Sequence, residues 1–164
     1  MRKFWQEIRG YVLLIILVIL IRTYLATPAI VDGESMENTL YDGEVVIINK
    51  IAYGIVDIER FDIVVLKNEE DDDKIIKRII GLPNETIEYR ENTLYVNGLK
   101  IVTSVSFEDT EDFKVETGDG EYFVLGDNRD VSKDSRMLGN FTEKDFIGRV
   151  GLRIYPFNKI GFVK

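Results

Sequence analysis

The sequence of 164 residues contains no cysteine and no histidine. Without cysteine the chain can form neither a disulfide nor a thiolate nucleophile, and without histidine it cannot build a serine–histidine pair. Both absences also remove the usual zinc ligands, so we expect neither a metal ion nor another cofactor. A serine nucleophile in this chain would therefore need a different base.

Positive charge is scarce outside the N-terminus. The formal net charge is −8, yet residues 1–22 carry four cationic side chains and one glutamate, which leaves −11 for the rest of the chain. An acidic body argues against binding to a phosphate backbone, so we expect no nucleic-acid partner. The hydrophobic and charged fractions, 45% and 30%, are those of one globular domain.

Long hydrophobic runs are also rare, and the main one lies near the N-terminus. Residues 11–21 form an uninterrupted apolar run of 11 residues, with Arg2, Lys3 and Arg9 before it. About 20 residues are needed to span a bilayer, and flanking aromatic and aliphatic residues extend this run on both sides. Because Pro28 disfavours helix at the preceding residue, we expect the helix to end near Ala26.

We predict that residues 1–28 form a cytoplasmic N-terminus and a single transmembrane anchor in the cell membrane, because basic residues favour the cytoplasmic side. Residues 29–164 would then form an extracytoplasmic domain. Two alternatives remain open. A cleaved signal peptide has the same basic and apolar layout, although Pro28 interrupts any small-x-small cleavage site. A buried helix of a soluble protein is the other.

The body is rich in short β-branched runs separated by turn residues. Asn97-Gly98 between two such runs predicts a hairpin, and Thr142 could cap one helical turn within residues 141–147. We expect exposed loops at the acidic run 69–73, at residues 103–120 and at residues 126–140. The pattern predicts a mainly β fold, an antiparallel curved or barrel-like sheet with one N-terminal transmembrane helix. We expect strands at residues 29–31, 45–48, 63–66, 74–80, 87–89, 93–96, 99–101, 121–125 and 149–155.

Ser35 is the first candidate for chemistry. It lies in the segment Gly-Glu-Ser-Met-Glu-Asn-Thr-Leu at residues 33–40, just after the first expected strand. A serine in such a segment more often shapes a turn or caps a helix than acts as a nucleophile. Its importance depends on whether the rest of the chain supplies a base.

Lys77 is the candidate base. In an extended segment alternate residues share a face, so Lys77 would lie between Ile75 and Ile79. A lysine enclosed by isoleucines loses hydration, which lowers its pKa and provides a neutral amine near physiological pH. The alternative is a lysine on the exposed face of an edge strand, where it prevents aggregation.

The loop at residues 126–136 is dense in carboxylates, amides, hydroxyls and guanidinium groups. It is not an EF-hand, because a calcium loop starting at Asp127 or Asp130 would lack the required glycine and the final glutamate. Ser132 and the pair Asp134 and Arg136 could instead form a polar network that orients a lysine amine. A solvated turn is the alternative.

Together these pieces resemble the type I signal peptidase family, the membrane-anchored Ser/Lys endopeptidases that remove signal peptides from exported preproteins. The resemblance covers nearly the whole chain, and the order and spacing of its motifs are specific. The matching segments are the N-terminal apolar helix and residues 33–40, 42–46, 50, 77–83, 126–136 and 147–150. The short chain, with one anchor, is similar to the compact Gram-positive-type members.

The resemblance implies that Ser35 attacks the scissile carbonyl and that neutral Lys77 takes its proton. It also implies that Ser132 hydrogen-bonds to the lysine amine and that Arg136 pairs with Asp134. The supporting residues by position are Ser132, Asp134, Arg136 and Asp127.

Three positions depart from the family pattern. Asn38 stands where many members have proline, and Asn84-Glu85 stands where Gly-Asp is frequent. Gly33 replaces a serine whose hydroxyl helps to form the oxyanion hole in some members. The hole would then rely on the Ser35 backbone N–H and an unidentified second donor.

The resemblance also implies how substrate binds. A signal peptide would lie extended beside residues 29–32 and 75–77, and shallow pockets from Val31, Met36, Leu40 and Ile76 would accept only small side chains. The expected partners are preprotein signal peptides and the lipid bilayer. The candidate substrate-binding residues are Val31, Asp32, Gly33, Met36, Leu40, Ile75 and Ile76.

Three other classes of protein remain as rivals. Self-cleaving Ser/Lys repressors have a similar β core and dyad, but they lack the anchor and the loop at residues 126–136. A membrane-tethered binding module would use Ser35 and Lys77 structurally. An aspartic dyad of Asp127 and Asp134 would work best in acid and would tolerate replacement of Ser35.

Overall fold

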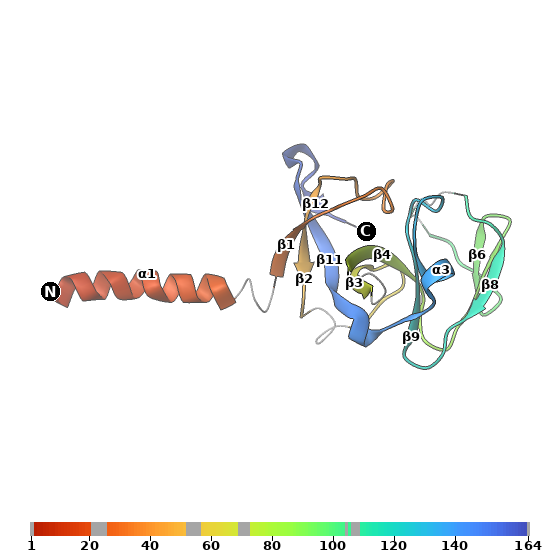
Figure 1. The fold of residues 1–164 in the computed structure, drawn as a ribbon, viewed down its shortest axis with the longest axis horizontal. Helices are drawn as coiled ribbons and strands as arrows, with labels where there is room; N and C mark the ends of the chain where they lie inside the picture. The colour runs from red at the N-terminus through yellow and green to blue at the C-terminus, as the bar shows by residue number, and fades with distance from the viewer. Residues whose placement is uncertain are drawn as a thin grey trace.

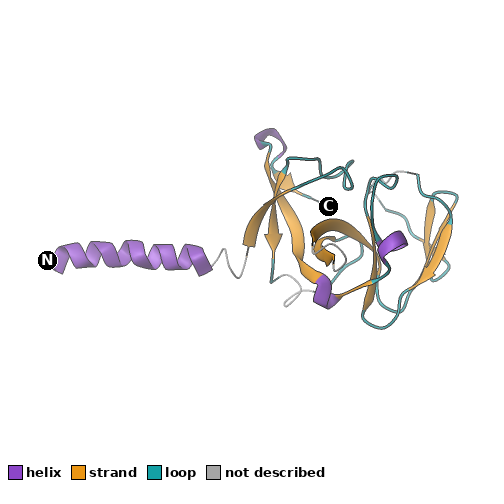
Figure 2. Ribbon diagram, in the orientation of Figure 1, coloured by secondary structure: helices purple, strands orange, loops and turns teal. Residues whose placement is uncertain are grey.

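The computed structural model of the chain describes residues 2–20, 26–51, 57–68, 73–103, 105 and 109–163. Of the acidic run 69–73, only Asp73 falls within these ranges, where it begins a strand and not a loop. Figure 2 shows one long helix and a body of strands joined by loops, with only short helical segments. The prediction of a mainly β protein with little helix is therefore confirmed.

The first element is helix α1 (Arg2–Leu20), which projects away from the β body (Figure 1). Its residues 11–19 are each between 47% and 68% exposed. In the part of the chain that the structure describes, no helix is long and apolar enough to cross a membrane. Ala26 begins the first strand and pairs with Asn49, so the helix does not include Ala26, and residues 21–25, where we expected the helix to end, lie outside the described residues.

Twelve strands and three short helical segments follow α1 in the described ranges. The first strands are β1 (Ala26–Ile30), β2 (Val45–Asn49), β3 (Ile63–Asn68), β4 (Asp73–Gly81), β5 (Thr86–Arg90), β6 (Thr93–Val96) and β7 (Leu99–Lys100). The later strands are β8 (Phe113–Glu116), β9 (Glu121–Leu125), β10 (Phe141–Thr142), β11 (Phe146–Tyr155) and β12 (Gly161–Phe162). The helical segments are α3 (Ser135–Leu138), η2 (Glu143–Asp145) and η3 (Phe157–Lys159).

The strands form two antiparallel sheets. The larger has the order β1-β2-β11-β3-β4-β9-β10, with β12 added beside β11, and the smaller has the order β7-β6-β5-β8. Figure 1 shows the smaller sheet at the end of the body opposite α1. Within the described strands the larger sheet has two ends, β1 and β10, so it is open. The prediction of a closed, barrel-like sheet is therefore wrong, and the antiparallel sheet is open.

Two elements appear where we expected only loops. Strand β8 lies within residues 103–120 and pairs with β5, because Phe113 and Val115 alternate with exposed residues and pack against the core of the smaller sheet. Helix α3 lies within residues 126–140, and the Asp134 side chain caps it by accepting from the Arg136 backbone N–H. The helical turn expected after Thr142 is present as η2.

Strand β4 is an interior strand of the larger sheet, between β3 and β9. One core cluster packs where the sheet meets the segment that follows β1. It includes Val31, Met36, Leu40, Val46 and Ile48, all at most 6% exposed. This cluster lies under the loop that carries Ser35, so the core holds the candidate nucleophile beside β4.

Candidate active site

Ser35 lies in a loop that is closed at its base and anchored in the core. The Val31 N–H donates to the Glu44 carbonyl at 2.8 Å and the Gly43 N–H to the Val31 carbonyl at 2.9 Å. Between them, the Leu40 N–H donates to the Met36 carbonyl at 2.8 Å. Because Val31, Met36 and Leu40 are each at most 2% exposed, the loop is fixed on one side and offers half-buried Ser35 on the other.

Two backbone conformations explain two of the departures noted in the sequence. Gly33 has φ +88°, and its N–H donates to Asp42 Oδ1 at 2.9 Å. A serine there would pay a steric cost that glycine does not. Asn38 has φ +82°, a left-handed conformation that asparagine tolerates and a proline ring cannot adopt.

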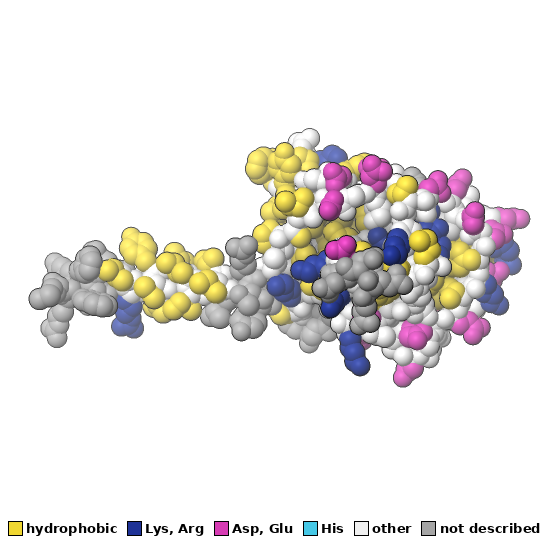
Figure 3. Space-filling view, viewed as in Figure 1, with side chains coloured by type: hydrophobic (Ala, Val, Ile, Leu, Met, Phe, Trp, Pro, Cys, Tyr) yellow, Lys and Arg dark blue, Asp and Glu magenta, His cyan; other side chains and the backbone are white. Residues whose placement is uncertain are grey.

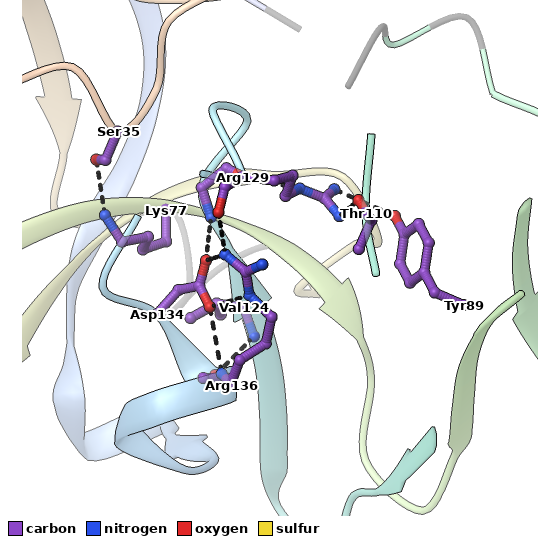
Figure 4. A network of polar contacts seen from close by, with 10 residues as sticks. Ser35, Lys77, Tyr89, Thr110, Val124, Arg129, Asp134 and Arg136 are labelled. Atoms are coloured by element: carbon purple, nitrogen blue, oxygen red, sulfur yellow. Dashed lines mark hydrogen bonds and ion pairs between the residues drawn. The ribbon is translucent and has the colours of Figure 1, made fainter. Parts of the chain in front are cut away.

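Lys77 reaches Ser35 from the middle of β4. Its backbone lies opposite Val64 of β3, its side chain is buried at 3% residue exposure, and Nζ donates to Ser35 Oγ at 2.8 Å (Figure 4). Burial lowers the pKa of Lys77 to about 8, although the charges of Asp134 and Asp127 act in the opposite direction. A large fraction of the amine is therefore neutral at mildly alkaline pH.

Arg78 points to the opposite face of β4 and is fully buried. Its Nε and Nη2 donate to the two carboxylate oxygens of Asp127 at 2.8 and 2.6 Å. The hydroxyl of Thr39 also donates to Asp127 and accepts from Arg78. Asp127 thus joins the Ser35 loop to β4, and both of its oxygens are occupied.

The segment after β9 packs directly on Ser35. The Asn128 N–H donates to the Ser35 carbonyl at 3.2 Å, and a Cβ added to Gly126 would lie only 2.4 Å from that carbonyl oxygen. The Gly126 N–H donates to Asp134 Oδ2 at 3.1 Å. Arg136 in turn donates to Asp134 from Nε at 2.9 Å and from Nη2 at 3.0 Å, so this pair has the geometry that we expected.

Ser132 differs from expectation. Its hydroxyl is buried and has no hydrogen-bond partner among the described residues, so the expected bond to the Lys77 amine is absent. Lys77 donates to Ser35 instead. Leaving a buried hydroxyl unpaired costs roughly 1–3 kcal/mol.

A cavity of about 200 Å³ opens beside Ser35 and Lys77, between the end of β1 and strand β4. Six of the seven candidate substrate-binding residues line it. Leu40 does not, because its side chain is fully buried in the core beneath the loop. The cavity is lined by Ala29, Ile30, Val31, Asp32, Gly33, Ser35, Met36, Ile48, Val65, Lys74, Ile75, Ile76 and Lys77.

Two groups around the site were not anticipated. Arg129 is buried and donates to the Gly126 carbonyl, to Thr110 and to the Tyr89 hydroxyl, which ties the segment after β9 to the smaller sheet (Figure 4). Buried Glu44 accepts from Arg153 at 2.9 Å. The long-range contacts of these two groups have no signal in the sequence, because Thr110, Tyr89 and Arg153 lie 19 to 109 positions from their partners.

No group of three or more carboxylates is placed to hold a metal ion within the described ranges. The chemistry that the site offers is a serine hydroxyl against a buried lysine of lowered pKa, beside an apolar cavity. This combination on a β scaffold is that of a serine hydrolase without histidine.

The comparison with known proteins gives the family. The signal peptidase family, peptidase S26, matches residues 4–155, so the chain belongs to this family and is a serine peptidase. It is 39% identical to signal peptidase I of Bacillus amyloliquefaciens over 165 residues, which cover 93% of this chain and 88% of that protein. It is 34% identical to signal peptidase IB of Staphylococcus aureus strain MRSA252, covering 90% and 87%.

The fold comparison agrees. A crystal structure of a signal peptidase I from Enterococcus faecalis V583 is similar with a TM-score of 0.53 and 35% sequence identity. The match covers 58% of this chain and 97% of that one. The resemblance inferred from the sequence motifs is thus confirmed at the level of the family.

Proposed function

We propose that this protein removes signal peptides from exported preproteins by cutting after small-x-small sites, with Ser35 as nucleophile and Lys77 as general base. The observation that carries the proposal is the 2.8 Å contact between Ser35 Oγ and the buried Lys77 Nζ. Membership of the signal peptidase family supports the choice of substrate.

The mechanism follows from the state of the amine. When Lys77 is neutral, its lone pair accepts the Ser35 hydroxyl proton, and Oγ attacks the scissile carbonyl. The resulting ammonium donates its proton to the leaving amine as the C–N bond breaks, which leaves an ester on Ser35. Neutral Lys77 then deprotonates a water molecule that hydrolyses this ester, and the proton returns to the Ser35 hydroxyl. The Ser35 backbone N–H would stabilise the oxyanion, whereas the Gly33 N–H is held by Asp42, so a second donor must come from elsewhere.

The supporting residues have separate roles in this proposal. Asp127, through Arg78 and Thr39, holds the nucleophile loop against β4. Asp134 and Arg136 hold the Gly126 segment against Ser35, and in this proposal the Ser132 hydroxyl, unpaired among the described residues, would bind the Lys77 amine during turnover. These roles are structural support for the dyad.

Substrate selection rests on the cavity. β1 is an end strand of the larger sheet, and an extended peptide could lie beside residues 29–32 and 75–77. The residue before the cut would enter the apolar cavity formed by Val31, Met36 and Ile76. A space of about 200 Å³ shared by several substrate positions favours small side chains such as alanine.

The rival aspartic mechanism is disfavoured by the pairing of its carboxylates. Asp127 is bound by Arg78 and Asp134 by Arg136, whereas an aspartic dyad requires two carboxylates that share a proton. The self-cleaving repressor class is disfavoured by the family match over residues 4–155.

We propose further that residues 1–28 anchor the protein in the cell membrane as a single pass, with a cytoplasmic N-terminus and residues 29–164 outside. The exposed apolar residues 11–19 of α1 support attachment to lipid, and they form the yellow surface of the helix in Figure 3. A second apolar surface lies around η3, where Tyr155, Phe157, Ile160 and Phe162 are 48% to 85% exposed. Both surfaces are suited to contact with the bilayer.

The test is cleavage of a preprotein with a small-x-small site by the purified full-length protein in detergent. Ser35→Ala and Lys77→Ala should each lose activity by roughly 10⁴-fold or more while remaining folded. Lys114→Ala, which removes an exposed lysine from β8, is the matched control and should retain activity. Wild-type activity should rise with pH to a plateau above about 8, where Lys77 becomes neutral.

The alternatives predict different results. Full activity of Ser35→Ala would show that the nucleophile is wrong and would direct attention to the carboxylates. Absence of cleavage by every form, with several preproteins and added lipid, would favour the membrane-tethered binding module.

A further inference from the structure

A second, more open cleft lies next to the apolar cavity. It has a volume of about 520 Å³ and shares five lining residues with the apolar cavity, including both Ser35 and Lys77. The two spaces therefore meet at the candidate dyad. A peptide that fills the apolar cavity and passes Ser35 would continue into this second cleft.

The lining of the second cleft is acidic. The exposed residues Asp32, Glu34 and Asp42 line this cleft with three carboxylates, and Lys133 contributes one positive charge. Lys77 also lines it but is neutral in the reactive state. The cleft thus carries a net charge of about −2 when the base is ready to act.

Two of the three carboxylates are available to a ligand. Asp42 accepts from the Gly33 N–H, so it has a structural task in the nucleophile loop. The carboxylates of Asp32 and Glu34 make no hydrogen bond or ion pair with any described residue. Because both residues line the cleft together with Ser35, a charged substrate side chain in the cleft would meet them directly.

We propose that this cleft binds the first residues after the scissile bond, and that Asp32 and Glu34 make it select lysine or arginine there and reject aspartate or glutamate. The orientation of the bound peptide rests on the proposed function, in which the small residues before the cut occupy the apolar cavity. Exposed charge pairs are weak, so the selection is a matter of several-fold and not of absolute exclusion.

The experiment uses the full-length protein in detergent and three preproteins that differ only in the first two mature residues, which are Lys-Lys, Gln-Gln or Glu-Glu. At low salt, kcat/KM should follow the order lysine, glutamine, glutamate, with a ratio between the extremes of roughly three- to tenfold. Raising the salt concentration should reduce this ratio, because the charges on both sides are exposed.

Substitutions identify the source of the selection. The double variant Asp32→Asn/Glu34→Gln should bring the lysine-to-glutamate ratio close to one, whereas Lys133→Gln should raise it. Glu111→Gln, which neutralises an exposed carboxylate far along the chain and outside the cleft lining, should leave the ratio unchanged. The removal of negative charge and the removal of positive charge should shift the lysine-to-glutamate ratio in opposite directions. A general loss of activity could not produce both shifts.

The results separate this inference from the proposed function. Equal cleavage of all three preproteins after the small residue would overturn the inference and leave the signal peptidase proposal intact. A lysine preference that persists in the double variant would also overturn it. Cleavage of none of the preproteins would overturn the proposed function itself, and the inference with it.

Discussion

The position of Lys77 in the sheet lowers the pKa of its amine. Its side chain is almost completely enclosed, and the resulting loss of hydration outweighs the opposing charges of Asp134 and Asp127. In the proposed mechanism, this buried lysine does what a histidine does in other serine hydrolases. The same burial has a cost in folding stability, and that cost can be measured.

We predict that Lys77→Met stabilises the protein at neutral pH. The folded lysine has a pKa of about 8 against an ordinary value of 10.5, so the unfolded chain binds more protons between these pH values. The wild type should therefore gain stability as pH rises from about 8 to about 10.5. Below pH 8 the variant should exceed the wild type in free energy of unfolding by up to about 3 kcal/mol.

Urea unfolding followed by circular dichroism at several pH values measures this difference. The gap between variant and wild type should close above pH 10.5, and Lys114→Met at an exposed site should show no comparable gap. A Lys77→Met variant that is equally destabilised at every pH would contradict a lowered lysine pKa.

At the residue scale, Ser35 and Lys77 could be predicted from the sequence more readily than the contacts of the residues around them. Strand alternation indicated that Lys77 lies among isoleucines, and the motif resemblance supplied Ser35 as its partner. The Arg78–Asp127 pair could not be derived in the same way, because its members are 49 positions apart and join different elements. The expected Ser132 bond failed because the lysine amine is directed to Ser35.

At the scale of elements, the active site depends on how closely three segments approach one another. The Ser35 loop, strand β4 and the segment after β9 meet at Gly126, where an added Cβ would lie 2.2 Å from Ser132 Oγ and 2.4 Å from the Ser35 carbonyl oxygen. Only a residue without a side chain allows this contact.

We predict that Gly126→Ala moves the segment after β9 away from the Ser35 loop. This should lower kcat/KM by about 10²-fold, since a displacement of about 1 Å has such effects in active sites. Gly151→Ala in β11 is the matched control, because nothing lies within 4 Å of its added Cβ. Preprotein cleavage by both variants gives the comparison. Equal activity of the two would show that the close approach at Gly126 is dispensable.

The strands themselves were largely predictable from the sequence. Most β-branched runs became strands because both of their faces, or one of them, are buried. Strand β8 was hidden because its two apolar residues sit in an acidic, polar stretch. Helix α3 was hidden because four residues carry too little periodicity to be recognised.

At the scale of the whole molecule, apolar surface is concentrated on α1 and around η3, while the body is acidic. Figure 3 shows hydrophobic side chains along the helix and, on the body, a group of them at the end nearer to the helix. This distribution is the physical basis for the proposed attachment to a membrane.

We predict that the full-length protein floats with lipid vesicles in a density gradient and that Ile15→Lys/Ile19→Lys does not. Two lysines in an apolar segment cost about 5 kcal/mol or more in lipid, which is enough to reverse the partition. Val102→Lys, a change at an 87% exposed residue of the body, should float as the wild type does. Flotation of the double variant would show that α1 is not the attachment element.

The register of β4 against its neighbours also determines which cation lies beside Ser35. Lys77 lies opposite Val64 and Arg78 lies opposite Ile63, and the alternation of the strand sends the two side chains to opposite faces. A slip by one residue would exchange them and place a guanidinium, which does not lose its proton in proteins, beside Ser35. The proposed activity therefore requires the correct register between β3 and β4. A chain misregistered by one residue could keep the overall fold and still be inactive.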